Sequence, residues 1–368
     1  MNPLKSLKQI PKSAKTAFLV FVAAKLLVLA LGYTVTILNG GSGLDMFSRW
    51  DASNYVSIAK NGYITTGDET YYIVFFPLYP LLIRAFTWDF AYANLTALVI
   101  ANVCSFIAAL YLYKLAKLEF GDGEAVKAVL FLSVFPTAYF LSAPYTEGLF
   151  FALAIACFYY ARLGRWAVAG LLGFFASLTR LAGLLVLPAL LLEYYHQTGW
   201  KLKKIRPDVV FVFSALTGFL IYLAINNTVT GNPLTFMSVE AQHWHNRFDP
   251  IAGLEAAWYW ALNKSPTDSI TIGSAPIAFG VFGLVMIGIA VYKRFRPAYI
   301  LYMFMSWGLA LSTSWWISVP RYIMAMFPMF LVLATLTRRK VVNAAIVAFS
   351  AVWLCFFTVL FALGWWAF

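Results

Sequence analysis

The sequence predicts an all-α polytopic membrane protein, a bundle of about eleven transmembrane helices. Three observations lead to this prediction. Of the 368 residues, 62% are hydrophobic and only 11% are charged, which is more apolar than a water-soluble domain. Apolar runs of about 20 residues, long enough to cross a bilayer, recur along the chain with short polar breaks. Basic residues cluster between these runs. We therefore expect residues 1–368 to form a single transmembrane domain.

Six clusters of basic residues orient the predicted helices. Lysine and arginine prefer the cytoplasmic ends of transmembrane helices, so placing every cluster inside requires an even number of crossings between successive clusters. The clusters are Lys5, Lys8, Lys12 and Lys15; Lys114, Lys117 and Lys127; Arg162 and Arg165; Lys201, Lys203, Lys204 and Arg206; Lys293, Arg294 and Arg296; and Arg338, Arg339 and Lys340. Crossings that satisfy the condition are expected near residues 17–38, 92–113, 125–141, 148–160, 167–178, 181–194, 209–225, 277–292, 298–312, 322–336 and 341–363. The N-terminus is then cytoplasmic and the C-terminus is outside.

Two parts of this topology have an alternative. Residues 167–194 are about half as long as two ordinary spans need, so we expect two short helices that meet at Thr179–Arg180. The alternative is one long tilted helix. Residues 73–87 contain FFPLYPLLIR, which is too short and too rich in proline for a comfortable span. We expect this segment to lie in the membrane interface, and the alternative is that it crosses.

Two outer segments, residues 39–91 and 226–274, are long enough to carry chemistry. The first contains WDASNYVSIAKNGY. If residues 45–59 are helical, Phe47, Asp51 and Tyr55 share one face at about 100° per residue. A carboxylate among aromatic side chains at the membrane edge keeps a raised proton affinity, as a general base requires. The alternative is that Asp51 caps the helix or pairs with a neighbouring cation.

Three further charged residues lie at predicted outer ends of spans. Arg180 in ASLTRLAG and Arg321 in SVPRYIMAMFP stand apart from the cytoplasmic clusters. Their guanidinium groups can hold a phosphate through two parallel hydrogen bonds; the alternative is that they pair with a carboxylate or reach toward the interface. Glu147 in SAPYTEGLF is expected to have a binding role, although the positive end of a helix would also attract it.

Several other chemistries are not expected. The net charge of +12 lies in the cytoplasmic clusters and does not predict nucleic-acid binding. The cysteines Cys104, Cys157 and Cys355 fall in apolar runs and do not form a disulfide or metal pattern. His243 and His245 do not share a helix face and have no acidic partner at ligand spacing. We therefore expect neither a metal ion nor a cofactor.

Taken together, the motifs resemble a known family. The segment beginning at Trp50, FFPLYPLL, SAPYTEGLF, LTRLAG and VPRY occur in that order between residues 47 and 330. They resemble the mannosyltransferases of the PIG-V type, which use dolichol-phosphate-mannose. The resemblance implies a GT-C fold with a catalytic carboxylate in the first outer loop. At matching positions, Asp51 would be the base. The substrate-binding residues would include Trp50, Tyr55, Tyr63, Glu147, Arg180, Arg321 and Tyr322.

The resemblance implies a membrane glycosyltransferase that acts on the extracytoplasmic face. We expect it to transfer a hexose, most simply mannose, from a polyprenyl-phosphate donor to a lipid or glycan acceptor by inverting displacement. The outer loops are short for a eukaryotic member, which favours a prokaryotic enzyme in the cell membrane over one in the endoplasmic reticulum. The alternative is a transporter or flippase for a lipid-linked anionic substrate. That alternative predicts symmetry between the two halves, which the sequence does not show.

Overall fold

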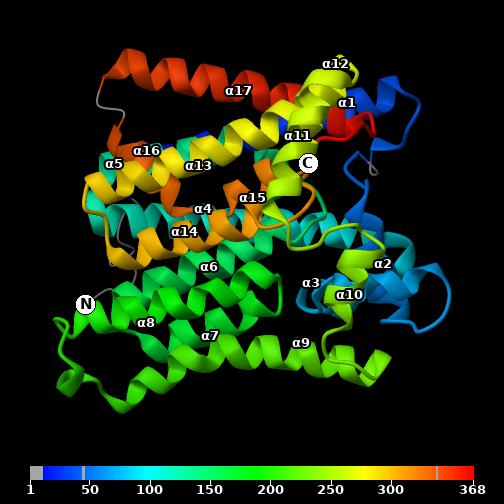
Figure 1. Ribbon diagram of the computed structural model, residues 1–368. Coiled ribbons are helices and arrows are strands. Elements are labelled where there is room, and N and C mark those ends of the chain that lie inside the picture. Colours follow the sequence, from blue (N-terminus) through cyan, green and yellow to red (C-terminus); the bar gives the residue numbers. More distant parts are fainter. Residues whose placement is uncertain (1–10, 44–45, 337–338) are drawn as a thin grey trace, which may run out of the picture.

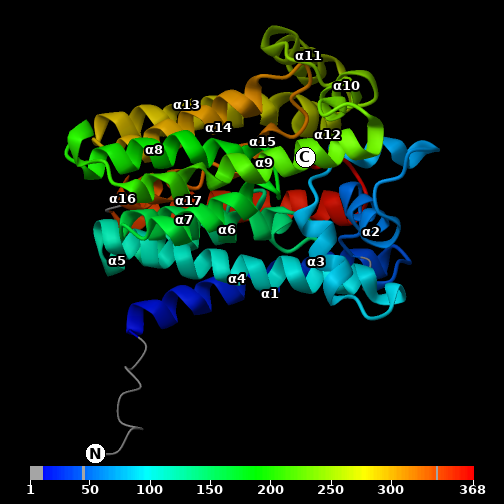
Figure 2. The same ribbon diagram turned by 90° about the horizontal axis from the view of Figure 1, so that it is seen from below.

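The computed structural model describes residues 11–43, 46–336 and 339–368, and the described chain is helical almost throughout. Lys5, Lys8 and Arg338 of the basic clusters lie outside these residues. The only extended pairing among the described residues is an antiparallel bridge between Phe248 and Thr313. Long helices lie side by side and form the body of the molecule, and shorter helices gather at one end of it (Figures 1 and 2).

The body contains twelve α-helices, several of them extended by a short 3-10 or π turn. They are α1 (Lys12–Leu38), α4 (Ala93–Phe120), α5 (Asp122–Ser133), α6 (Glu147–Arg162), α7 (Trp166–Ser177), α8 (Val186–Gln197), α9 (Ser214–Thr230), α13 (Ala275–Tyr292), α14 (Pro297–Leu311), α15 (Val319–Met324), α16 (Pro328–Leu336) and α17 (Lys340–Ala362). The helices at the end of the body are α2 (Asp51–Asn61), α3 (Leu78–Phe86), α10 (Thr235–Gln242), α11 (Pro250–Asn263) and α12 (Pro266–Asp268).

Five helical segments of the described chain have the length and apolar composition of a complete membrane span: 12–38, 90–120, 207–230, 266–292 and 340–362. The helices α7 and α14 are apolar but shorter. Large apolar side chains such as Leu26 on α1 and Val281 on α13 are exposed on the outside of the body, where they suit contact with lipid. The chain is therefore an integral multi-pass membrane protein. Most of the predicted crossings fall on helical segments, but those at residues 125–141 and 322–336 are interrupted by non-helical residues. The number of crossings stays a prediction.

The two ambiguous segments are resolved. α7 ends at Ser177, and a 3-10 turn that leads into α8 begins at Leu181, so two short helices meet at Thr179–Arg180 as predicted. The alternative of one continuous helix is wrong. α3 has nine residues and is about 14 Å long, less than half of the bilayer core. It packs against α2 and α4 at the end of the body and does not cross.

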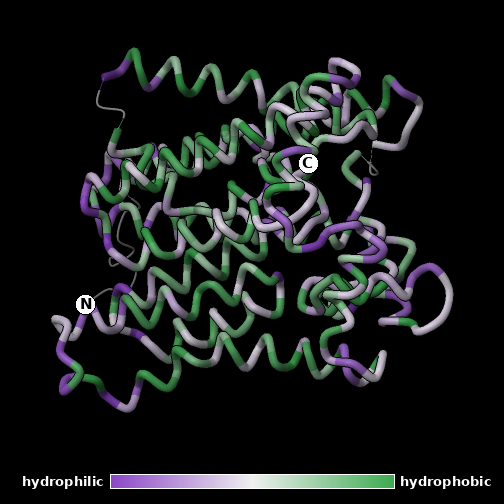
Figure 3. The backbone as a smooth tube through the Cα atoms, in the orientation of Figure 1, coloured by the Kyte–Doolittle hydropathy of each residue, from purple (hydrophilic) through white to green (hydrophobic). Residues whose placement is uncertain are grey.

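The basic clusters that the structure describes lie at the opposite end of the body from α2 and α3 (Figures 1 and 2). There, Glu119 at the end of α4 forms ion pairs with Arg162 of α6 and with Arg296 before α14, and Glu193 of α8 pairs with the same two arginines. At the start of α1, the Ser13 hydroxyl donates to Asp122. Polar residues are thus concentrated at the two ends of an apolar body (Figure 3), the pattern of a protein whose helices cross a bilayer.

A buried irregular segment leads the chain from α5 to α6. Residues 134–146 are all buried, and their backbone polar groups need partners there. Lys25 of α1 supplies some of them, because its ammonium group donates to the carbonyl of Leu141 and to the hydroxyl of Ser142. Asn102 of α4 donates to the carbonyl of Ser142 at 2.9 Å. These contacts explain the unusual lysine inside an apolar helix and hold the segment that ends at Glu147.

Candidate active site

Four charged side chains from distant parts of the sequence meet at the end of the body where α2 lies. Asp51 begins α2, Glu147 begins α6, Arg180 lies between α7 and α8, and Arg321 lies in α15. Nη1 of Arg321 donates to Oδ2 of Asp51 at 3.0 Å, and its Nε donates to Oε1 of Glu147. Nη1 of Arg180 donates to the same Glu147 oxygen and to the Thr146 hydroxyl. Two carboxylates and two guanidinium groups therefore form one connected cluster with no net charge.

The cluster is buried on its inner side. Glu147 is 2% exposed and Arg321 is 6% exposed. Buried charges of this kind persist only when they are paired and hydrogen-bonded. The guanidinium carbon of Arg321 also lies 4.8 Å from the ring centre of Phe140 and 4.7 Å from that of Tyr145, within the range of cation–π attraction. Arg321 is thus held by two carboxylates and two rings, and it fixes one oxygen of Asp51.

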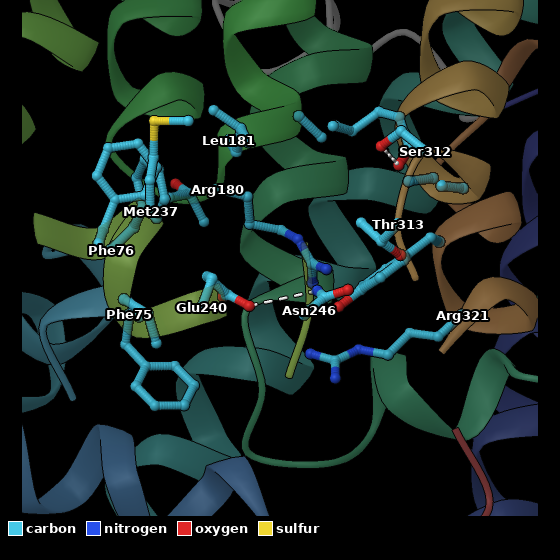
Figure 4. A pocket seen from close by; sticks show the side chains of 18 of the residues that line it. Phe75, Phe76, Arg180, Leu181, Met237, Glu240, Asn246, Ser312, Thr313 and Arg321 are labelled. Carbon is cyan, nitrogen blue, oxygen red and sulfur yellow. Dashed lines mark hydrogen bonds between the residues drawn. The ribbon is translucent and has the colours of Figure 1, made fainter. Parts of the chain in front are cut away.

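A cavity of about 650 Å³ opens beside the cluster, a volume typical of a small-molecule site. Asp51, Arg180 and Arg321 line it, together with Tyr55 and Tyr322. Figure 4 shows that Arg180, from the turn between α7 and α8, and Arg321, from α15, extend into this space. One wall of the cavity is apolar and contains Phe75, Phe76, Leu181, Phe219, Phe236 and Met237. The cavity therefore offers charged groups and a hydrophobic surface to the same ligand.

The two arginines are not equivalent. Arg321 uses both Nε and Nη1 on carboxylates. In the described part of the chain, Arg180 uses only Nη1, so its Nε and Nη2 have no protein acceptor. The ring of Tyr322 lies 5.5 Å from the guanidinium carbon of Arg180. Of Arg321, only Nη2 lacks an acceptor among the described residues. Arg180 therefore has more donors available to an anionic ligand, whereas Arg321 organises the two acids.

Not every residue singled out in the sequence reaches the cavity. Tyr55 does, with its ring packed against Phe75 and Tyr79. Trp50 is 46% exposed and packs against Trp366 instead. Tyr63 donates its hydroxyl hydrogen to the carbonyl of Phe75 at 2.6 Å and so supports the apolar wall from behind.

Glu147 does not line the cavity either, since both arginines lie between it and the open space. Trp50, Tyr63 and Glu147 are thus not among the residues that line the cavity. Their contact with substrate stays a prediction.

The cavity also contains two polar residues that the sequence did not indicate. Glu240 of α10 and Asn246 of the following loop both line it. Burial raises the pKa of Glu240, and the nearby negative charge of Asp51 raises it further, whereas the hydrogen bond from Asn246 acts in the opposite direction. No sequence motif identifies an acid in the outer loop. The signal that could have identified Glu240 is its spacing of four residues from Phe236, which places both residues on one face of a helix.

The sequence matches a known protein family. The family model described as Mannosyltransferase (PIG-V) matches residues 27–231, which is more than half of the chain. The matched range contains Asp51, Glu147 and Arg180, while Arg321 lies beyond it. No curated protein matches the sequence.

Among solved structures, the chain is similar to an oligosaccharyltransferase from Archaeoglobus fulgidus. The complex of that protein with zinc and sulfate has a TM-score of 0.50 at 13% identity, with 95% of this chain and 53% of that chain covered. The apo form has a TM-score of 0.48 at 12% identity, with 93% and 56% covered. This chain thus spans about half the length of the archaeal protein. The likeness to the zinc and sulfate complex shows a GT-C-like fold, and at this identity it shows the fold alone.

Proposed function

The chain belongs to the mannosyltransferase (PIG-V) family, and from that premise we propose how it uses its cavity. It is a membrane mannosyltransferase of the GT-C type. The proposal is that it transfers mannose from a polyprenyl-phosphate donor to a lipid or glycan acceptor on the extracytoplasmic face, by inverting displacement. The observation that carries the proposal is one cavity that combines Asp51, the free donors of Arg180 and an apolar wall.

The distribution of the basic residues supports an outer location for the cavity. α6 begins at Glu147 and ends at Arg162, about 24 Å away. Arg162 belongs to the end that carries the basic residues, and such residues favour the cytoplasmic side. The cavity is then extracytoplasmic, in a single domain with about eleven crossings, a cytoplasmic N-terminus and an outer C-terminus. A prokaryotic cell membrane suits the compact outer loops.

The lining suits a lipid-linked sugar phosphate. The aromatic wall formed by Phe75, Phe76 and Phe236 can pack against an isoprenoid chain. Arg180 has two donors free for phosphate oxygens, and hydrogen bonds between a guanidinium group and a phosphate are among the strong ones. The lipid keeps the donor in the same plane as the site, so neither a nucleotide nor a nucleotide-binding domain is needed.

The proposed reaction uses Asp51 as the base. Arg321 holds Oδ2, while Oδ1 has no hydrogen-bond partner among the described residues and can accept a proton from the acceptor hydroxyl. The acceptor oxygen attacks the anomeric carbon from the face opposite the phosphate, and the bond from that carbon to the phosphate oxygen breaks. Arg180 stabilises the departing phosphate. A β-linked donor then yields an α-glycoside, and Asp51 releases its proton to water.

A transporter or flippase does not fit the placement of the polar groups. Substrate sites of transporters lie near the midplane of the membrane. Here the charged cluster lies at the first residue of α6, at one end of the body. No observation in the described chain favours that alternative.

Incubation of the purified protein with radiolabelled polyprenyl-phosphate-mannose and total membrane lipids or glycans tests the proposal. We expect label to move into the acceptor fraction, and no transfer when guanosine-diphosphate-mannose replaces the lipid donor. Binding of the lipid donor is measured in parallel and does not require the acceptor. Absence of both binding and transfer would refute the proposal.

A further inference from the structure

We propose that Glu240 and Asn246 form a subsite for the sugar of the donor, in which their side chains bind two neighbouring hydroxyl groups of the hexose. This inference rests on the proposed function, because it assigns one part of the same donor to one part of the same cavity. It adds two residues for which neither the motifs nor the family match suggested a role.

The pair is built into the cavity wall. Nδ2 of Asn246 donates to Oε2 of Glu240 at 3.3 Å, and the backbone N–H of Asn246 donates to the carbonyl of Glu240 at 2.8 Å. The loop after Asn246 is anchored to the other side of the cavity. Arg247 exchanges hydrogen bonds with Ser314, and the Asp249 N–H donates to the carbonyl of Ser312. Both side chains are thus held in fixed positions that face the cavity (Figure 4).

The pair has hydrogen-bonding capacity that the protein does not use. Oδ1 of Asn246 is buried and has no hydrogen-bond partner among the described residues. Oε1 of Glu240, a partly buried residue, also accepts no hydrogen bond in the described part of the chain. Buried polar atoms in folded proteins are nearly always hydrogen-bonded. A ligand with hydroxyl groups would supply the missing donors.

The chemistry of the pair suits a sugar better than the other parts of the donor. A carboxyl group would repel a phosphate, and the two arginines in the same cavity would repel a metal cation. Burial raises the pKa of Glu240 and so increases the share of its protonated form, which can donate as well as accept a hydrogen bond. The carboxyl and amide groups together then offer donors and acceptors, as a hydroxyl pair requires.

Apolar and polar side chains of α10 line different parts of the cavity, and this arrangement suits a lipid-linked sugar. Phe236 and Met237 of this helix belong to the apolar wall, and Glu240 follows about one turn later. Arg180 reaches into the same space from the turn between α7 and α8. An isoprenoid chain on the apolar wall and a phosphate at Arg180 would leave the hexose beside Glu240 and Asn246.

Binding measurements with two probes test the subsite. The probes are polyprenyl-phosphate-mannose and polyprenyl phosphate without sugar, and the proteins are the wild type, Glu240→Ala, Glu240→Gln and Asn246→Ala. We expect Glu240→Ala and Asn246→Ala each to lose about tenfold in affinity for the mannosylated lipid, the value of one buried hydrogen bond. Affinity for the sugar-free lipid should not change. Glu240→Gln should stay within about threefold of wild type, since glutamine keeps one donor and one acceptor.

The control variant is Glu255→Ala, which removes an exposed acid from α11 outside the cavity and should bind both probes as the wild type does. Retained binding of the sugar-free lipid shows that each variant is folded. Equal weakening for both probes, or no weakening for either, would overturn the subsite even when the wild type transfers mannose. Failure of the wild type to bind either lipid would overturn the proposed function and the subsite with it.

Discussion

Replacing Asp51 by asparagine should abolish most of the activity and leave the fold intact. Asparagine has the same shape as aspartate and can still accept a hydrogen bond from Arg321, but it cannot take a proton at neutral pH. A positioned general base contributes about 10²- to 10⁴-fold to a rate. We therefore expect turnover to fall by that factor, which corresponds to about 3–5 kcal/mol of transition-state stabilisation.

The cost to folding should be much smaller. The side chain of Asp51 is 26% exposed and forms one ion pair, with Arg321 at 3.0 Å. Arg321 keeps its second carboxylate, Glu147, in the variant, so no guanidinium group is left buried and unpaired. Partly exposed ion pairs contribute about 1 kcal/mol or less. The thermal unfolding midpoint in detergent should fall only slightly.

The assay compares transfer, donor binding and thermal unfolding for the wild type, Asp51→Asn and Asp68→Asn. Asp68 is an exposed acid in the same outer segment, so its variant controls for the chemical change. The expected result is loss of transfer by Asp51→Asn with donor binding and unfolding near wild type. Normal turnover by Asp51→Asn would remove this residue from the mechanism. Loss of donor binding together with turnover would show that Asp51 acts by holding the cluster and not as a base.

Three further variants test other parts of the structure. Arg180→Ala should weaken binding of polyprenyl-phosphate-mannose by about 10- to 100-fold, because hydrogen bonds to a charged group contribute about 1.5–3 kcal/mol; unchanged affinity would show that the phosphate is held elsewhere. Glu147→Gln should lower the free energy of unfolding by about 3–5 kcal/mol, since the buried guanidinium group of Arg321 and the partly buried one of Arg180 both lose a charged partner, and an unfolding curve like that of the wild type would contradict the buried cluster. Lys25→Ala leaves the carbonyl of Leu141 and the hydroxyl of Ser142 without this donor. It should cost about 1–3 kcal/mol in the same unfolding measurement, and a stability equal to that of wild type would argue against this role.

The sequence indicated as site residues those that carry a charge where a membrane protein rarely has one. Asp51, Arg180 and Arg321 stood out because charges outside the cytoplasmic clusters of a membrane protein need a local reason. The structure brings all three to one cavity. Glu240 and Asn246 did not stand out, because polar residues are ordinary in an outer loop and only the packing of α10 shows that they line the same cavity as Asp51.

The placement of neighbouring aromatic residues was harder to predict. Trp50 and Tyr63 flank α2 in the sequence, yet Trp50 packs against Trp366 and the hydroxyl of Tyr63 donates to the carbonyl of Phe75. Helical periodicity identified the face that Asp51 shares with Tyr55. It carried no information about residues outside the regular part of α2, which ends at Asn61.

The sequence by itself determined the class of the protein and identified the two segments, residues 73–87 and 167–194, that do not fit a simple pattern of spans. These are local properties, because whether a segment prefers lipid or water depends on its own composition and on the charges at its ends. Only the tertiary structure decided which arginine is free to bind a ligand and which one is committed to two acids. That choice depends on contacts such as the one between Arg321 and Asp51, which are 270 residues apart in the chain. Packing of the whole bundle creates such contacts, and no local pattern encodes them.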